Sequence, residues 1–150
     1  MALGAVSFGM AGAAFDQITV TLSPEYFLLG KHVAPGGSLR WSAALVGFNG
    51  GLSIGALTLG VFSWFRARGR KVRLGSLIAL SALAVLPASA VAALFLLTFD
   101  PFGVRAESLG IMGRGAASRY LLAWSLHIGA YVGPAVCLAI NAVRTARRAA

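Results

Sequence analysis

Few residues of this chain could carry chemistry, and the most prominent is a single histidine in an apolar segment. Apart from arginines near their ends, His127 is the only charged residue or histidine within the long apolar runs, and an ionisable residue at such a position is by default a candidate functional site. A neutral imidazole could ligate a haem or a chlorophyll. The simpler interpretation is a histidine hydrogen-bonded to a neighbouring helix. Because the apolar runs contain no second ligand, the cofactor stays unknown and no metal site is predicted.

Asn49 is the other strongly polar residue deep within an apolar run. If that run crosses a membrane, the side-chain amide lies in hydrocarbon and needs a hydrogen-bond partner. The second and fourth apolar runs are expected to cross the membrane in the same direction. Asn49 lies ten residues beyond Leu39, and His127 lies nine residues beyond Ser118. At 1.5 Å per residue both sit roughly 14 to 15 Å below one boundary. We therefore predict that Asn49 and His127 form a polar intramembrane pair.

Motifs of the common enzyme classes are missing from the sequence. It has no nucleotide-binding loop, no H-E-x-x-H, no C-x-x-C and no interpretable Ser/His/Asp set. The single cysteine, Cys137, excludes an intrachain disulfide. No acidic residue falls within a predicted span, which argues against a proton-coupled transporter working alone. We expect that the protein is not an enzyme and has no catalytic residue.

Composition indicates that most of the chain lies in lipid. Charged residues make up 11% of the 150 residues and apolar residues 58%, with a mean hydropathy of +0.81, whereas a soluble domain carries about 25% charge. Crossing about 30 Å of hydrocarbon takes roughly 20 residues. The sequence predicts an all-α integral membrane protein, one domain over 1–150, with four transmembrane helices at about 1–15, 39–65, 74–99 and 118–143. The first is short, and Ala11-Gly12-Ala13 resembles a processing site, but a retained helix is preferred.

The distribution of charge predicts the orientation. Two basic clusters contain no acid, which is typical of cytoplasmic segments; they consist of Arg66, Arg68, Arg70, Lys71 and Arg73, and of Arg144, Arg147 and Arg148. All four acids lie in the two other connections, 16–38 and 100–117. We expect a bacterial inner membrane protein with both termini in the cytoplasm. The basic residues behind the net charge of +9 are then expected to set the orientation of the spans or to contact anionic lipid, and nucleic acid is not an expected partner.

The first outside connection has a pattern of its own. Residues 17–22 alternate polar and apolar side chains, which predicts an extended segment. Ser23 and Pro24 suit the start of a helix, so a short interfacial helix is expected at about 24–29, with Tyr26 and Phe27 at headgroup level. Contact with a partner, or with this protein's own outer surface, is expected from Asp16, Gln17, Glu25, Tyr26 and Phe27. Asp16 and Glu25 do not have the spacing of a metal motif.

The segment Asp16-Gln17-Ile18-Thr19-Val20-Thr21-Leu22-Ser23-Pro24-Glu25-Tyr26-Phe27 resembles a motif, D-Q-[IV]-[ST]-x-[ST]-[IL]-S-P-E-Y-F, of uncharacterised small bacterial polytopic membrane proteins. In that family the motif follows a first membrane segment, and further hydrophobic spans come after it. The resemblance covers about a dozen residues closely and the rest in hydrophobic layout only. It implies a true first span and an outside connection, and it supplies no catalytic residue.

Glycines in two of the spans indicate close helix packing. Gly47, Gly51 and Gly55 recur every four residues, and Gly129 and Gly133 repeat the pattern in the fourth span. We therefore expect an accessory or structural subunit of a larger inner-membrane assembly, for example an energy-converting complex, with membrane lipids and other membrane subunits as partners. The alternative is a haem-, pigment- or lipid-binding membrane protein that uses His127. A small transporter or channel is the third hypothesis.

Overall fold

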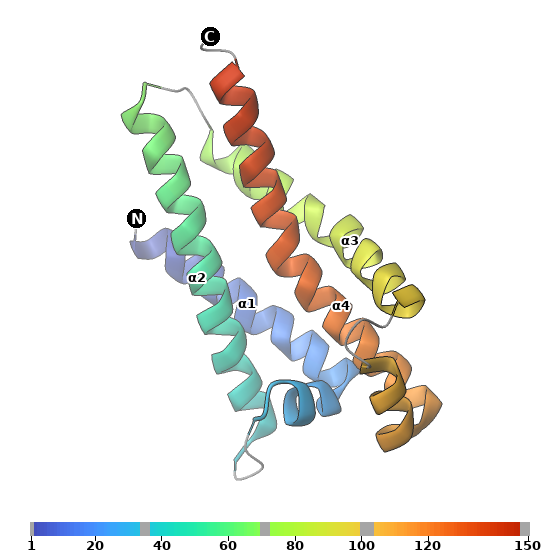
Figure 1. Cartoon of the computed structure of the whole chain (residues 1–150). Coiled ribbons are helices and arrows are strands. Elements are labelled where there is room, and N and C mark those ends of the chain that lie inside the picture. The colour runs from blue at the N-terminus through green and yellow to red at the C-terminus, as the bar shows by residue number, and fades with distance from the viewer. Residues whose placement is uncertain (1, 34–36, 70–72, 100–103, 148–150) are drawn as a thin grey trace.

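The computed structural model describes residues 2–33, 37–69, 73–99 and 104–147, and every secondary-structure element in these ranges is a helix. Its long elements are α1 (Ala2–Leu22), α2 (Leu39–Ala67), α3 (Leu74–Phe99) and α4 (Val104–Arg147). A single π-helical turn, η1 (Tyr26–Gly30), lies between α1 and α2. Figure 1 shows the helices as two crossing pairs, α1 with α2 and α3 with α4.

Three helices are long and apolar enough to cross a membrane: Leu39–Ala67, Leu74–Phe99 and Gly113–Arg144. They coincide with the predicted spans at 39–65, 74–99 and 118–143. Large apolar side chains on their outer faces are exposed, for example Leu83 at 70% and Leu86 at 71%. Exposed leucines of this kind are what a lipid-facing surface requires, because hydrocarbon does not penalise them.

Glycines bring α1 and α2 into backbone contact. A Cβ atom on Gly47 would lie 2.7 Å from the carbonyl carbon of Gly12, and one on Gly51 would lie 3.1 Å from the Cα of Gly9. One on Gly55 would meet the Cβ of Phe8 at 2.7 Å. The predicted packing face of the second span therefore contacts α1 of the same chain.

The second pair is built in the same way. A Cβ atom on Gly129 would lie 2.6 Å from the backbone nitrogen of Ser89, and one on Gly133 would lie 2.7 Å from the carbonyl oxygen of Ala84. Small residues set the distance between helix axes where lipid offers no hydrophobic drive for association. The two halves of the chain are thus two tightly packed helix pairs.

The connection before the last span differs from the prediction. Residues 104–117, expected in an outside loop, belong to α4, which is interrupted at Gly113 by a backbone with φ 71° and ψ 169°. Only glycine adopts this region of φ/ψ space at low cost. Gly113 therefore separates a first helical segment from the part that could cross the membrane.

The prediction of an extended segment at 17–22 is wrong, because α1 continues to Leu22. The hydroxyls of Thr19 and Thr21 donate hydrogen bonds to the backbone carbonyls of Phe15 and Gln17, which fits β-branched threonines into the helix. Packing against the neighbouring helices outweighs the β propensity of the segment.

The Ser23-Pro24 signal does begin a helical turn. The hydroxyl of Ser23 accepts a hydrogen bond from the backbone N–H of Tyr26 at 3.3 Å. Tyr26 and Phe27 are then buried, with 5% and 0% of their surface exposed. They form a core with Val20, Ala43, Tyr120, Leu121 and Ala123. Both aromatic rings therefore pack inside the protein, and the turn docks on this chain's own surface; their level in a membrane stays a prediction.

Candidate functional site

The two helix pairs meet at a buried contact between Asp16 of α1 and His127 of α4. The Nε2 of His127 lies 2.9 Å from the Oδ1 of Asp16, and the side chains are 5% and 3% exposed. The Nδ1 of His127 lies 2.8 Å from the backbone carbonyl oxygen of Ala123. A carbonyl oxygen only accepts, so Nδ1 carries a hydrogen and donates it.

This arrangement fixes where the remaining proton can be. With Nδ1 protonated, Nε2 either accepts a hydrogen bond from a protonated Asp16 carboxyl or, as imidazolium, donates one to the carboxylate. One proton lies between Nε2 and Oδ1 in both forms. The Asp16–His127 contact is therefore a buried hydrogen bond with one proton between the two side chains.

Three aromatic rings enclose the imidazole. The ring centroids of Tyr26, Phe15 and Phe27 lie 4.6, 5.4 and 6.0 Å from that of His127. Burial, and after it the charge of neighbouring ionisable side chains, raises the pKa of Tyr26 above its ordinary value. The phenol of Tyr26 is thus kept neutral beside the Asp16–His127 contact.

Asp16 lies within a long helix, whereas the sequence predicted it in a connection between helices. Predicted as part of an outside connection, it is the fifteenth residue of α1, six residues before its end at Leu22. An acidic residue therefore lies within a long helix and meets a histidine. The three helices that could cross a membrane do not include α1, so Asp16 bears on proton coupling only if α1 is also a span.

The predicted Asn49–His127 pair is wrong. His127 is bonded to Asp16, whereas Asn49 lies on the exposed side of α2. Equal depth in the membrane fixes the level of two residues but not the direction in which their side chains point. Asn49 uses its backbone carbonyl to accept a hydrogen bond from Ser53 within α2.

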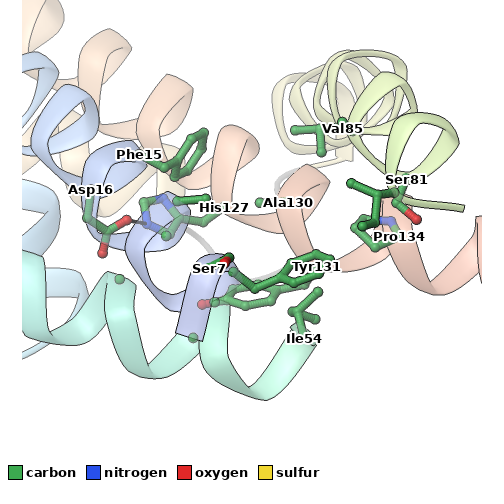
Figure 2. A pocket seen from close by; sticks show the side chains of 18 of the residues that line it. Ser7, Phe15, Asp16, Ile54, Ser81, Val85, His127, Ala130, Tyr131 and Pro134 are labelled. Carbon is green, nitrogen blue, oxygen red and sulfur yellow. Dashed lines mark hydrogen bonds and ion pairs between the residues drawn. The ribbon is translucent and has the colours of Figure 1, made fainter. Parts of the chain in front are cut away.

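A cavity of about 690 Å³ opens between the two helix pairs beside this contact. Asp16, His127 and Tyr131 line one part of it, and apolar side chains form nearly all the remaining wall. In Figure 2, Tyr131, Ile54 and Ser7 lie between the Asp16–His127 contact on one side and Ser81 and Pro134 on the other. The cavity therefore has an apolar body and a small polar region.

Two buried polar atoms on residues of the cavity wall lack a partner among the described residues: the Oδ2 of Asp16 and the Oγ of Ser81. An unsatisfied buried acceptor is costly, by about 1 to 3 kcal/mol. A hydrogen-bond donor reaching Oδ2 would remove that cost.

The other predicted contact residues act locally. The Nε2 of Gln17 donates to the backbone carbonyl of Arg40 at 2.9 Å and ties the end of α1 to the start of α2. Glu25 accepts a hydrogen bond from the hydroxyl of Ser23 at 3.0 Å. Neither residue joins Asp16 in one site.

Within the described residues, the basic clusters stay at the surface. Arg66, Arg68, Arg73 and Arg144 are exposed, and the guanidinium of Arg68 lies 4.0 Å from the ring centroid of Trp64. Arg70, Lys71, Arg148 and the side chain of Arg147 lie outside the described part.

The geometry does not fit the ligation of a haem or pigment metal by His127, because both ring nitrogens already have partners within the chain. Among the residues that the structure describes, no group of three or more His, Cys, Asp or Glu side chains could hold a metal ion. What the described residues of this site show is a pair of hydrogen bonds to the imidazole of His127.

Tyr131 and the cavity were not predicted from the sequence. Tyr131 follows His127 by four residues, the spacing that places two side chains on one face of a helix. This four-residue spacing was the signal in the sequence that could have identified Tyr131.

Comparison with known proteins gives no match: no family model, no curated protein and no solved structure is significantly similar to this chain.

Proposed function

We propose that this chain is a multi-pass membrane protein that binds a hydrophobic small molecule of the lipid class between its two helix pairs. The observation that carries the proposal is the cavity of about 690 Å³ whose apolar walls include one polar contact, Asp16–His127. Small-molecule sites typically measure about 300 to 1,000 Å³ and combine apolar walls with a few polar groups. Of the sequence hypotheses, lipid binding near His127 is the one that this geometry favours.

The proposal includes α1 as a fourth span. Its 21 residues extend over about 32 Å, enough for a hydrocarbon core of about 30 Å. Its glycines pack along α2, and its one acidic residue is paired with His127. Pairing reduces the cost of a carboxyl group at depth. With four spans, the basic clusters support cytoplasmic termini in a bacterial inner membrane.

The role of an accessory subunit stays a prediction. The glycine faces that suggested a partner are used within this chain. Co-purification of other subunits from native membrane would test that role separately from lipid binding. The expectation that the protein is not an enzyme also stays a prediction.

The binding proposal is tested by filling the cavity. Ala130 lines the cavity, whereas Ala135 lies on the exposed side of the same helix. We expect Ala130→Phe to carry less co-purified lipid than the parent protein, measured by native mass spectrometry from mild detergent. Ala135→Phe adds the same ring outside the cavity and should carry as much lipid as the parent. Equal lipid on both variants would contradict the proposal.

A further inference from the structure

A second hollow lies on the α1–α2 pair, apart from the cavity between the two helix pairs. It is an open groove, and the described residues that line it do not line that cavity. One wall is the start of α2, and the other belongs to α1 and consists of Met10, Ala13, Ala14 and Gln17. The groove is therefore a separate candidate for binding.

One end of the groove carries the side chain of Arg40, which is exposed. Gln17 holds this residue through two contacts. The Nε2 of Gln17 donates to the backbone carbonyl of Arg40 at 2.9 Å, and the Nη1 of Arg40 donates to the Oε1 of Gln17 at 3.5 Å. Among the described residues Arg40 has no acidic partner. Since a guanidinium has five N–H donors, most of those of Arg40 are available to an anion.

The position of Arg40 indicates which anion the groove would meet. Arg40 and Trp41 are the second and third residues of Leu39–Ala67, a helix long and apolar enough to cross a membrane. Such a helix begins near the membrane boundary, where lipid phosphates lie and tryptophan is enriched. Trp41 lines the groove and is 67% exposed. Because arginine binds phosphate through paired N–H donors, Arg40 is complementary to the head group of an anionic phospholipid.

The rest of the groove suits a hydrocarbon chain. Beyond Arg40 its lining is apolar and mostly small, and consists of Ala13, Ala14, Ala44 and Met10. From Gln17 to Met10 this lining extends over about 10 Å of α1. Gln17 is bonded to Arg40, and Gly12 contacts Gly47 further along α2. The apolar lining therefore leads from the start of α2 toward the depth that this helix would reach in a membrane.

We infer that this groove binds one anionic phospholipid, with its phosphate at Arg40 and one acyl chain along the alanines of α1 and α2. The site is separate from the cavity of the proposed function and does not rest on it. Alanines also suit a partner helix, but an apolar helix would leave the charge of Arg40 without an anion. The unpaired charge therefore favours the lipid.

The experiment measures contact with the groove through the fluorescence of Trp41. In a Trp64→Phe, Trp124→Phe background Trp41 is the remaining tryptophan, and lipids with brominated acyl chains quench its fluorescence on contact. In the reconstituted chain we expect brominated phosphatidylglycerol to quench more than brominated phosphatidylcholine. Arg40→Gln should lower this preference about 5-fold, the effect of one basic residue near anionic lipid. Arg119→Gln is the matched control, because it removes an exposed arginine outside the groove lining.

A steric variant separates a fitted groove from general attraction by charge. Ala14→Phe keeps every charge but narrows the groove, so it should also reduce the preference. Equal quenching by the two lipids, equal effects of Arg40→Gln and Arg119→Gln, or no effect of Ala14→Phe would each overturn the inference. Ala130→Phe fills only the other cavity and should leave the preference unchanged. If it removes the preference, the anionic lipid lies in that cavity, and the inference fails while the proposed function stands.

Discussion

The backbone contact between α1 and α2 predicts that one added methyl group will separate these helices. In Gly51→Ala the new Cβ would lie 2.9 Å from the carbonyl carbon of Phe8 and 3.1 Å from the Cα of Gly9. Carbon atoms pack at about 3.5 to 4.0 Å, so the helices must move apart by about 1 Å. A gap of that size forfeits a quarter to a half of each affected dispersion contact, and overpacking typically costs about 1 to 3 kcal/mol.

Gly60→Ala is the matched control. Gly60 lies on the same helix, and a Cβ there would meet nothing within 4 Å. Both substitutions gain about 1 kcal/mol of helix propensity, so this gain cancels when the two variants are compared. We expect the free energy of unfolding of Gly51→Ala to be lower than that of Gly60→Ala by about 1 to 3 kcal/mol.

The measurement is reversible unfolding in mixed micelles with increasing dodecyl sulfate, followed by circular dichroism. A lower midpoint for Gly51→Ala alone supports the contact. Equal midpoints for the two variants would refute the reasoning, because they would mean that α1 does not approach α2 closely.

Three further predictions follow from other parts of the molecule. A double-mutant cycle of Asp16→Ala and His127→Ala should give a coupling of about 0.6 to 1.7 kcal/mol, the range for membrane hydrogen bonds; strict additivity would exclude the contact. Because burial raises the pKa of Tyr26, its neutral form stabilises the fold fully below about pH 10, and stability should fall as pH rises above that value; Tyr26→Phe, followed by the same unfolding assay, should show a smaller slope than the parent protein. In a Cys137→Ser background, Arg70→Cys in intact cells should resist a membrane-impermeant thiol reagent until the cells are opened; labelling from outside would overturn the predicted orientation.

The long helices were predictable because the signals that define them are local. Apolar runs of more than 20 residues identify the spans within a few residues at each end. The segment at 17–22 was mispredicted for the opposite reason. Its period-2 pattern is genuine, but Val20 is buried against residues of η1, α2 and α4, and these distant contacts cannot be read from six neighbouring residues.

The site was half predictable. His127 was found because an ionisable residue in an apolar run is unusual. Its partner was missed because the first helix was expected to end at residue 15, which left Asp16 in a connection, whereas α1 continues to Leu22. Asn49 was predicted as the partner because it lies at the same level as His127, but the level of a residue does not show in which direction its side chain points. The cavity arises from the crossing of two helix pairs, which is a property of the tertiary structure alone.

The separation of Asp16 and His127 by 111 residues has a consequence for synthesis. Ribosomes add about 5 to 20 residues per second, so Asp16 leaves the ribosome roughly 6 to 22 s before His127. The α1–α2 hairpin contains its own glycine contacts and can assemble in that interval. During this time the carboxyl group of Asp16 lacks its imidazole partner, and burying a polar group without a partner is costly. The Asp16–His127 contact can therefore close only after α4 has been made and has packed against the α1–α2 hairpin.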